Sequence, residues 1–256
     1  QLFMAEAPGP SADKMHPRIT ETAKRLWLIY FGLTFTEFFL LKFAGMTWFD
    51  AINHAMATMS TGGFSTKNSS IAHYNGLPII QYIIIVFMFI AGANFVLTYF
   101  ALKGKIRKVF NSEEFKYYFF GTIGVTLLIS FLIINFQDPN LVSTLNHPKV
   151  WGPNESAFRH AAFSVVSVLT TTGFVSADFT MWSYMITALI FSLFFIGGSA
   201  GSTSGGVKIV RHIIMIKSSF YEFKKLLHPN AIIPVRYDGG SVPKTIIYNI
   251  LSFFIL

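Results

Sequence analysis

The fold is decided by a short apolar segment that runs directly into hydroxyl and glycine residues, TWFDAINHAMATM-STGGFST at residues 47–66. Its first part is apolar and compatible with a helix for only about 12 residues, which is too short to cross a bilayer. That length is typical of a re-entrant half-helix, which enters the membrane and turns back. We therefore expect a half-helix over about 48–59 and a turn over 60–66.

A second segment repeats this plan 110 residues later. A short apolar run, expected to form a helix over about 156–169, ends in TTTGFVS at residues 170–176. At this offset Gly63 falls on Gly173 and Thr61 falls on Thr171, and long apolar stretches flank both segments. A repeat of this length is too long for a solenoid unit and is typical of a duplicated membrane module.

The two turns form the first candidate site. Irregular backbone at membrane depth is tolerated only where it lines a polar cavity or is buried in protein, and glycine permits the dihedral angles that such a backbone needs. Converging carbonyl oxygens can replace the water shell of an alkali cation, next to the negative end of a helix. We expect an ion filter made by Ser60, Thr61, Gly62, Gly63, Thr170, Thr171, Thr172 and Gly173. The alternative is a pair of ordinary glycine turns at the membrane surface.

The composition of the whole chain is that of a membrane protein. Of its 256 residues 52% are hydrophobic and 12% are charged, too little charge to coat a water-soluble domain. The lack of Cys excludes disulfides, thiolate metal sites and cysteine nucleophiles. Apolar stretches predict spans over 26–44, 79–101, 117–136 and 183–197, the last continuing over 207–216. Because the chain starts at Gln1 and its last apolar stretch is cut short, we expect an interior piece of a longer protein.

Basic residues are confined to alternate loops. Sixteen of the 20 Lys and Arg residues lie within 1–25, 102–117 and 207–244. The positive-inside tendency places these loops in the cytoplasm. The net charge of +8 is then a topology signal rather than a nucleic-acid footprint, and we expect the bilayer as a partner and no nucleic acid.

A second candidate site interrupts the last span with the sequence FFIGGSAGSTSGGVK at 194–208. A phosphate-binding loop needs Lys and then Ser or Thr directly after its last glycine, whereas Val207 and Lys208 follow here. Small polar residues with little packing instead predict a mobile segment that lines the ion path below the filter and gates it. This gate loop comprises Gly197, Gly198, Ser199, Ala200, Gly201, Ser202, Thr203, Ser204, Gly205 and Gly206. We expect Lys208 and Arg211 to anchor its inner end to lipid phosphates or a partner, and a flexible cytoplasmic linker is the alternative.

With these motifs the chain resembles the superfamily of Trk, Ktr and plant HKT potassium transporters, and most of all the bacterial Trk-type membrane subunit. The resemblance covers essentially the whole chain and rests on QLFMAEAPGP at 1–10, the two turns and the stretch 197–211. It implies an all-α integral membrane fold in which four span, half-helix, turn, span repeats surround one pore. It further implies that this chain holds the second and third repeats and the start of the fourth, so that the first and fourth filter strands lie outside it.

The resemblance also divides the chain. It implies cytoplasmic segments at 1–25, 102–116 and 217–243, the second repeat at 26–101, the third at 117–216 and the start of the next span at 244–256. It implies potassium uptake through a bacterial inner membrane, with the ion held by the backbone carbonyls of Thr61, Gly62, Thr171 and Thr172. Potassium is then a transported substrate, and no tightly bound cofactor is expected. A homodimer and a cytosolic nucleotide-binding regulatory subunit are the implied partners.

Other interpretations stay open. A sodium-permeable transporter of the same fold differs only in ion preference, and the sequence does not separate coupled from channel-like flux. A membrane enzyme would need titratable groups around one cavity, and an anchoring subunit would need no ion path; cation flux of the full-length protein separates these classes. We expect His54 and His160 to be packing groups, Lys67 to be a surface lysine, and Glu37 to face protein while Lys42 reaches the membrane surface.

The topology can be tested by labelling. Lys105 and Lys225 should be cytoplasmic, whereas Ser70 and Asn146 should be external. In intact cells, an impermeant thiol reagent should label Ser70→Cys and Asn146→Cys and leave Lys105→Cys and Lys225→Cys unlabelled. Labelling of the two lysine positions alone would invert the topology.

Overall fold

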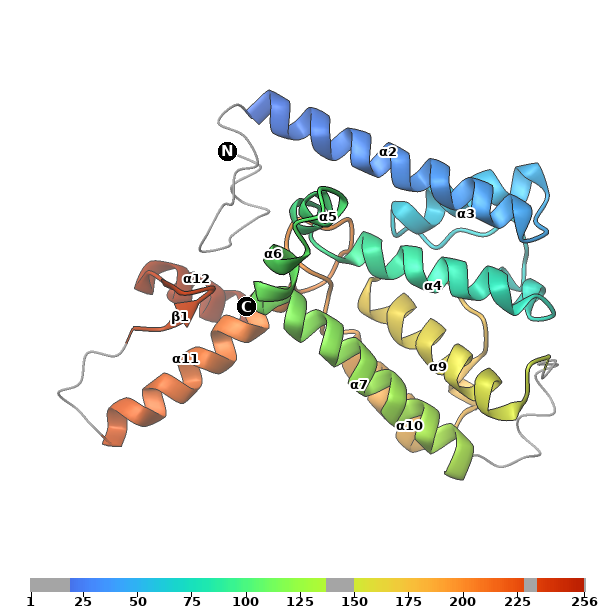
Figure 1. Ribbon diagram of the computed structural model, residues 1–256. Helices are drawn as coiled ribbons and strands as arrows, with labels where there is room; N and C mark the ends of the chain where they lie inside the picture. The colour runs from blue at the N-terminus through green and yellow to red at the C-terminus, as the bar shows by residue number, and fades with distance from the viewer. Residues whose placement is uncertain (1–18, 137–149, 228–233, 256) are drawn as a thin grey trace.

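The computed structural model describes residues 19–136, 150–227 and 234–255 (Figure 1). The resemblance motif at 1–10 and the proposed external residue Asn146 lie outside these residues. The described chain is mostly helical, as expected of an all-α fold, with one small exception: residues 236–241 form a hairpin of two antiparallel two-residue strands.

The elements, in chain order, are α2 (Ile19–Phe43), α3 (Trp48–Met59), the 3₁₀ turn η1 (Ser70–Tyr74), α4 (Pro78–Gly92), α5 (Phe95–Leu102), α6 (Ile106–Asn111), α7 (Glu113–Phe136), α9 (Pro153–Leu169), η2 (Phe179–Met181), α10 (Tyr184–Leu193), α11 (Ile209–Leu227), β1 (Arg236–Tyr237), β2 (Gly240–Ser241) and α12 (Lys244–Ile255). Two of these helices are long and apolar enough to cross a membrane, over Ala23–Phe43 and Glu113–Asn135.

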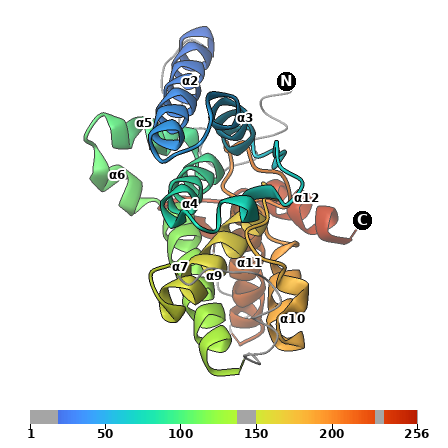
Figure 2. The same cartoon turned by 90° about the vertical axis from the view of Figure 1, so that its right-hand side faces the viewer.

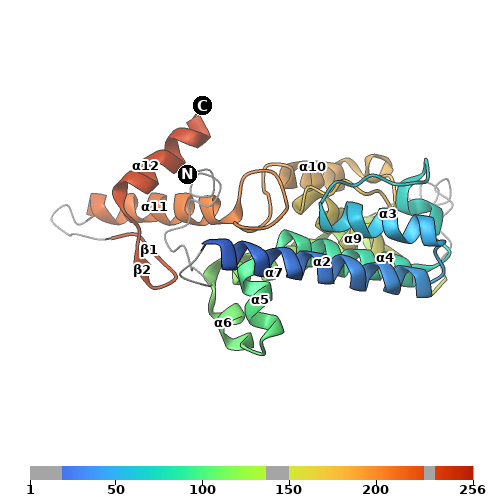
Figure 3. The ribbon, with the colours of Figure 1, turned by 90° about the horizontal axis from the view of Figure 1, so that it is seen from above.

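The helices form two neighbouring groups, α2–α4 and α7–α10, which meet where α4 packs on α9 (Figures 1 and 2). Seen from above, α11, α12 and the hairpin lie together at one end of the molecule (Figure 3). The outer faces of α2 and α7 expose large apolar side chains such as Phe31 and Phe131, whereas hydroxyl residues such as Thr58 and Thr170 are buried. This inverted distribution is the one that a lipid environment requires.

Local sequence sets the start of both short helices. Thr47 caps α3 by accepting a hydrogen bond from the amide of Asp50 at 3.1 Å, and the Asp50 carboxylate sits in the positively polarised first turn. Pro153 opens α9, where its missing amide is not needed, and Glu155 follows in the first turn. Both helices end where the hydroxyl and glycine residues begin.

The stretch expected to span over 79–101 is not one continuous helix but two helices with a sharp bend between them. α4 ends at Gly92 and α5 begins at Phe95, and the two axes differ by 113°. A β-carbon on Gly92 would lie 2.5 Å from a methyl carbon of Thr170 and 2.6 Å from the hydroxyl of Tyr118. Only glycine at this position therefore allows the end of α4 to pack this closely against α7 and the end of α9. Asn94 then starts α5 by accepting the amide of Val96 at 2.8 Å.

The last predicted span also differs in detail. α10 covers only 10 residues, and residues 194–208 leave the helical path as expected. α11 does not stop near 216 but continues to Leu227, through part of the segment expected to be a cytoplasmic loop. Glu37 is fully buried, as expected, and the ammonium of Lys42 bonds to the carbonyl of Met46 at 3.2 Å at the end of α2.

Candidate functional site

The first turn, residues 60–66, leaves α3 through backbone that most residues avoid. Thr61 has a φ of 53° and Gly63 a φ of 66°. The amides of Thr61 and Gly62 bond back to the last turn of α3 at 3.0 and 2.8 Å. The carbonyl oxygens of Thr61 and Gly62, by contrast, accept no backbone hydrogen bond from the described residues. The turn therefore holds free acceptors at the negative end of a helix.

The second turn, residues 170–176, has the same geometry. Thr171 has a φ of 55° and Gly173 a φ of 83°, and the amides of Thr171 and Thr172 both bond back to the last turn of α9 at 2.9 Å. Within the described chain the carbonyls of Thr171 and Thr172 also accept no backbone hydrogen bond. A positive φ is uncommon for a β-branched residue, so its occurrence at two positions 110 residues apart indicates one local design used twice.

The two turns lie against each other. A β-carbon on Gly63 would lie 1.9 Å from the carbonyl oxygen of Thr172, so the two backbones approach within a distance that only glycine permits. Above this contact, the amide of Ala72 donates to the carbonyl of Val175 at 3.0 Å. A β-carbon on Gly173 would meet nothing within 4 Å among the described residues. The structure thus places the two predicted filter turns in contact, through Gly63 on one side and Thr172 and Gly173 on the other.

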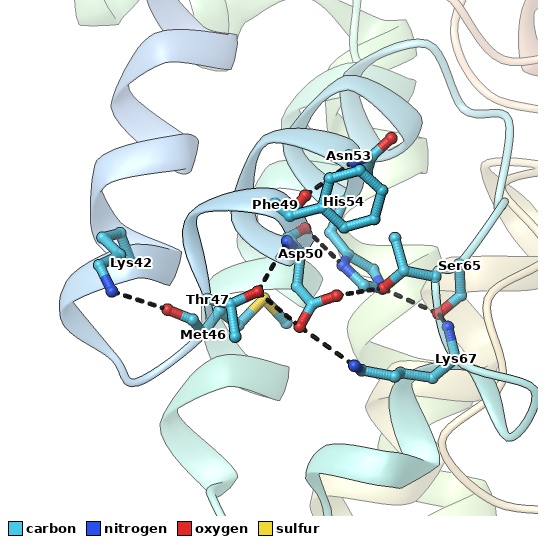
Figure 4. A network of polar contacts seen from close by, with 10 residues as sticks. Lys42, Met46, Thr47, Phe49, Asp50, Asn53, His54, Ser65 and Lys67 are labelled. Carbon is cyan, nitrogen blue, oxygen red and sulfur yellow. Dashed lines mark hydrogen bonds and ion pairs between the residues drawn. The ribbon is translucent and has the colours of Figure 1, made fainter.

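A polar network braces the first turn from behind (Figure 4). The Asp50 carboxylate accepts the hydroxyls of Thr66 at 2.5 Å and Thr47 at 2.8 Å, and it pairs with the Lys67 ammonium at 3.3 Å. His54 bridges the carbonyl of Asp50 and the hydroxyl of Ser65, at 2.7 and 2.9 Å. The prediction that Lys67 is an ordinary surface lysine is therefore wrong, because it is the cation of this network.

The Asp50 carboxylate is held in its charged form. Burial favours the neutral acid, but the hydrogen bonds from Thr66 and Thr47 and the pairing with Lys67 outweigh it, and the pKa of Asp50 lies below its ordinary value. An acidic residue in the first turn of an apolar half-helix was the signal for this site, and the sequence interpretation did not use it.

A second network braces the second turn. The Ser167 hydroxyl donates to the carbonyl of Phe174 at 2.7 Å, and His160 bonds to the Ser176 hydroxyl at 3.0 Å. Both His54 and His160 are therefore hydrogen-bonded packing groups, as expected.

A buried arginine extends this second network. Arg159 is fully buried, pairs with Glu155 at 2.8 Å and donates to Gln81. Gln81 in turn donates to Asn75, whose amide group donates to the carbonyl of Ser176 at 3.2 Å. Sequence reasoning missed Arg159, although a charged residue inside a predicted re-entrant helix marks such a position.

The glycine-rich loop, residues 197–206, touches both turns. The Thr61 hydroxyl donates to the carbonyl of Thr203 at 2.9 Å. The amide of Gly205 donates to the Thr171 hydroxyl at 2.6 Å. The two threonines with positive φ, one from each turn, are therefore the groups that join the predicted filter to the predicted gate.

The break between α4 and α5 holds the other side of the loop. The carbonyl of Gly92, released by the end of α4, accepts the amide of Ser199 at 2.9 Å, and the amide of Phe95 donates to the carbonyl of Gly201 at 3.2 Å. The Thr203 hydroxyl donates to the carbonyl of Ala91 at 3.1 Å. The expectation that little packing holds the loop is therefore wrong for this conformation.

The inner end of the loop is bound within the chain as well. A β-carbon on Gly197 would lie 2.4 Å from the carbonyl of Gly205, so the loop closes on itself at glycine. The Lys208 ammonium donates to the carbonyl of Ser204, and the Arg211 guanidinium lies 4.3 Å from the ring centre of Phe253. Both cations thus have contacts within the described chain, and their anchoring to lipid or a partner stays a prediction.

Comparison with known proteins gives a consistent result. The family model of TrkH, described as a cation transport protein, matches residues 3–256. The Trk system potassium uptake protein TrkH of Escherichia coli K12 is 39% identical over 256 residues, covering 99% of this chain and 50% of the relative. TrkH of Halomonas elongata is 37% identical over 255 residues, with coverages of 99% and 50%, and TrkG of Escherichia coli K12 is 32% identical over 259 residues, with coverages of 100% and 50%.

A solved structure matches equally broadly. The crystal structure of the potassium transporter TrkH from Vibrio parahaemolyticus superposes with a TM-score of 0.84 and 33% identity, covering 99% of this chain and 52% of that one. The chain thus spans about half the length of the relatives that it matches.

Loss of the Asp50 charge should loosen the first turn. Because Asp50→Asn removes three charge-assisted contacts, we expect it to lower stability by about 1–3 kcal/mol, measured by thermal unfolding in detergent. The pKa of Asp50 is lower when folded than when unfolded, so this stability is present above about pH 4 and is lost as the pH falls below it. The exposed Asp178→Asn, which keeps the cap on Thr180, is the control. Equal melting temperatures for both variants and the parent at neutral pH would contradict the role of the network.

Proposed function

This chain belongs to the TrkH family of cation transport proteins, and from that premise we propose that it forms part of a potassium uptake path across a membrane. The pair of matched turns carries the proposal. Four backbone carbonyls, those of Thr61, Gly62, Thr171 and Thr172, accept no backbone hydrogen bond within the described residues. Unpaired carbonyls inside a membrane protein are costly unless water or an ion bonds to them.

In this proposal the four carbonyls hold the dehydrated potassium ion. Each set follows the end of a short helix, where the partial negative charge favours a cation. The ion needs no side-chain charge, so the carbonyls exchange its water shell for oxygen ligands and release it again. The networks behind the turns keep those oxygens in place: Asp50 and Lys67 behind the first, Arg159 and Gln81 behind the second.

The glycine-rich loop is the gate in this proposal. It lies directly against Thr61 and Thr171, the first residues of the filter with positive φ. A loop bonded to both turns stands in the path of an ion that leaves them, and its removal opens that path. Eight of its ten residues are Gly or Ser, which allow a second backbone arrangement at low steric cost.

The same proposal gives the larger assembly. The matched turns and helices support two span, half-helix, turn, span modules, at 26–101 and 117–216, and the family resemblance adds two more around the same pore. A bacterial inner membrane, a homodimer and a cytosolic nucleotide-binding regulatory subunit belong to this proposal too. A sodium-permeable transporter is the second candidate, since carbonyl ligands by themselves bind either ion. A family of cation transport proteins does not favour an enzyme.

Serine at the filter glycines should lower ion selectivity. Gly173→Ser has room for its side chain, so we expect insertion at the parent level and a lower preference for potassium over sodium, because a φ of 83° disfavours any β-carbon. Gly63→Ser meets the carbonyl of Thr172 and should lose transport altogether or misassemble. The measurement is rubidium and sodium flux of the full-length protein in liposomes. Unchanged selectivity in Gly173→Ser would refute the filter, and sodium preference in the parent would favour the second candidate.

Shortening the loop should open the path. Deleting several residues within 198–205 removes the bonds to Thr61 and Thr171, and we expect a higher cation flux that depends less on the regulatory subunit. Flux is measured in the same liposomes, normalised to inserted protein. Normal insertion with flux at or below the parent level would mean that the loop is a linker.

A further inference from the structure

One acidic side chain outside the filter holds the glycine-rich loop. Glu114, in the first turn of α7, is only 4% exposed, and its carboxylate accepts the amide of Ala200 at 2.6 Å. Ala200 is itself buried, at 8% exposure. The bond joins residues 86 positions apart and is shielded from water. We propose that Glu114 is the positioning residue of the gate, whose carboxylate keeps the loop in its closed arrangement.

The chemistry of this bond sets it apart from the bonds that join the loop to the two turns and to the break between α4 and α5. The contacts to Gly92, Phe95, Thr61 and Thr171 join neutral amides, carbonyls or hydroxyls. Glu114 supplies a side-chain carboxyl oxygen to a backbone amide, and this bond is stronger when the carboxyl is ionised. Loss of the acceptor also leaves the amide of Ala200 buried without its partner.

The neighbouring residue ties the same helix end to the hairpin. The amide of Glu113 donates to the carboxylate of Asp238 at 2.7 Å, and the carboxylate of Glu113 pairs with the Lys217 ammonium. Lys217 also donates to the carbonyl of Arg236 at 3.0 Å. The hairpin, the start of α7 and α11 are thus one bonded unit, and α11 with the hairpin lies at one end of the molecule (Figure 3).

Charge and burial agree with this arrangement. Tyr237 of the hairpin is buried. Its burial is the main cause that raises its pKa above the ordinary value, and the nearby carboxylates of Glu114, Asp238 and Glu113 raise the pKa further. Three carboxylates therefore gather around the hairpin and the start of α7. Glu113 and Glu114 are consecutive on one helix, so a displacement of the hairpin that moves Glu113 also moves Glu114. The hairpin is the element through which a movement on the inner side reaches the loop.

This inference rests on the proposed gate and is tested by flux of the full-length protein in liposomes without a regulatory subunit. Glu114→Leu removes the acceptor, and we expect about a tenfold rise in rubidium flux. Glu114→Gln keeps the shape and a neutral acceptor, so it should give about a threefold rise and carries the test if the leucine variant does not insert. The control is Glu222→Leu on the exposed face of α11, which should leave flux unchanged.

A second arm separates positioning from a general structural role. Asp238→Gly removes the carboxylate that accepts the amide of Glu113, and glycine suits the φ of 47° at this position. This variant should raise flux less than Glu114→Leu. Neither variant should raise flux further in a protein whose loop is already shortened. A further rise in flux in the shortened-loop protein would overturn the positioning role and leave the gate standing. The same conclusion would follow if Glu114→Leu and Glu114→Gln kept the parent flux while loop shortening raised the flux. Parent flux in every variant, the shortened loop included, would overturn the gate and this inference together.

Discussion

Backbone amides and carbonyls inside a bilayer have no water to bond, and this constraint connects the irregular parts of the structure. α4 breaks at Gly92 and frees carbonyls, and the glycine-rich loop leaves the helical path between α10 and α11 and frees amides. The two breaks satisfy each other: the amide of Ser199 bonds to Gly92, and the amide of Phe95 bonds to Gly201. Neither segment could be irregular at this depth alone. Within the described residues, the carbonyls of Thr61, Gly62, Thr171 and Thr172 in the two turns accept no backbone hydrogen bond, and in the proposed function an ion takes the place of a donor there.

The same constraint explains why charged groups lie inside. A turn with free carbonyls has few backbone bonds of its own, so its shape must come from side chains. Asp50 and Lys67 hold the first turn, and Arg159 holds the second through Glu155 and Gln81. Buried charges are costly unless paired, and here each is paired or accepts several donors. Their contribution is a defined backbone shape more than stability.

Much of the fold followed from local sequence, and the failures have one cause. The extent of α3 and the end of α9 were evident because each apolar run stops where the hydroxyl and glycine residues begin, but α9 starts at Pro153, three residues before the expected start near 156. The bend after Gly92 was missed because residues 79–101 are mostly apolar and contain no proline, and the local signals of Gly92 and Asn94 were not used. What satisfies the backbone at the bend is the loop more than 100 residues away, which no local pattern reports. Lys67 was misjudged for a related reason, since its partner Asp50 is set by tertiary packing.

The offset of 110 residues found the paired threonines, but only the structure gives their second role. Thr61 and Thr171 each adopt a positive φ, which turns the backbone carbonyl out of the helix and leaves the hydroxyl facing the loop. In the proposed function, one residue would serve the filter with its backbone and the gate with its side chain. Movement of the loop away from the turns must break both hydroxyl bonds. The proposed filter and the proposed gate are therefore coupled through these two threonines.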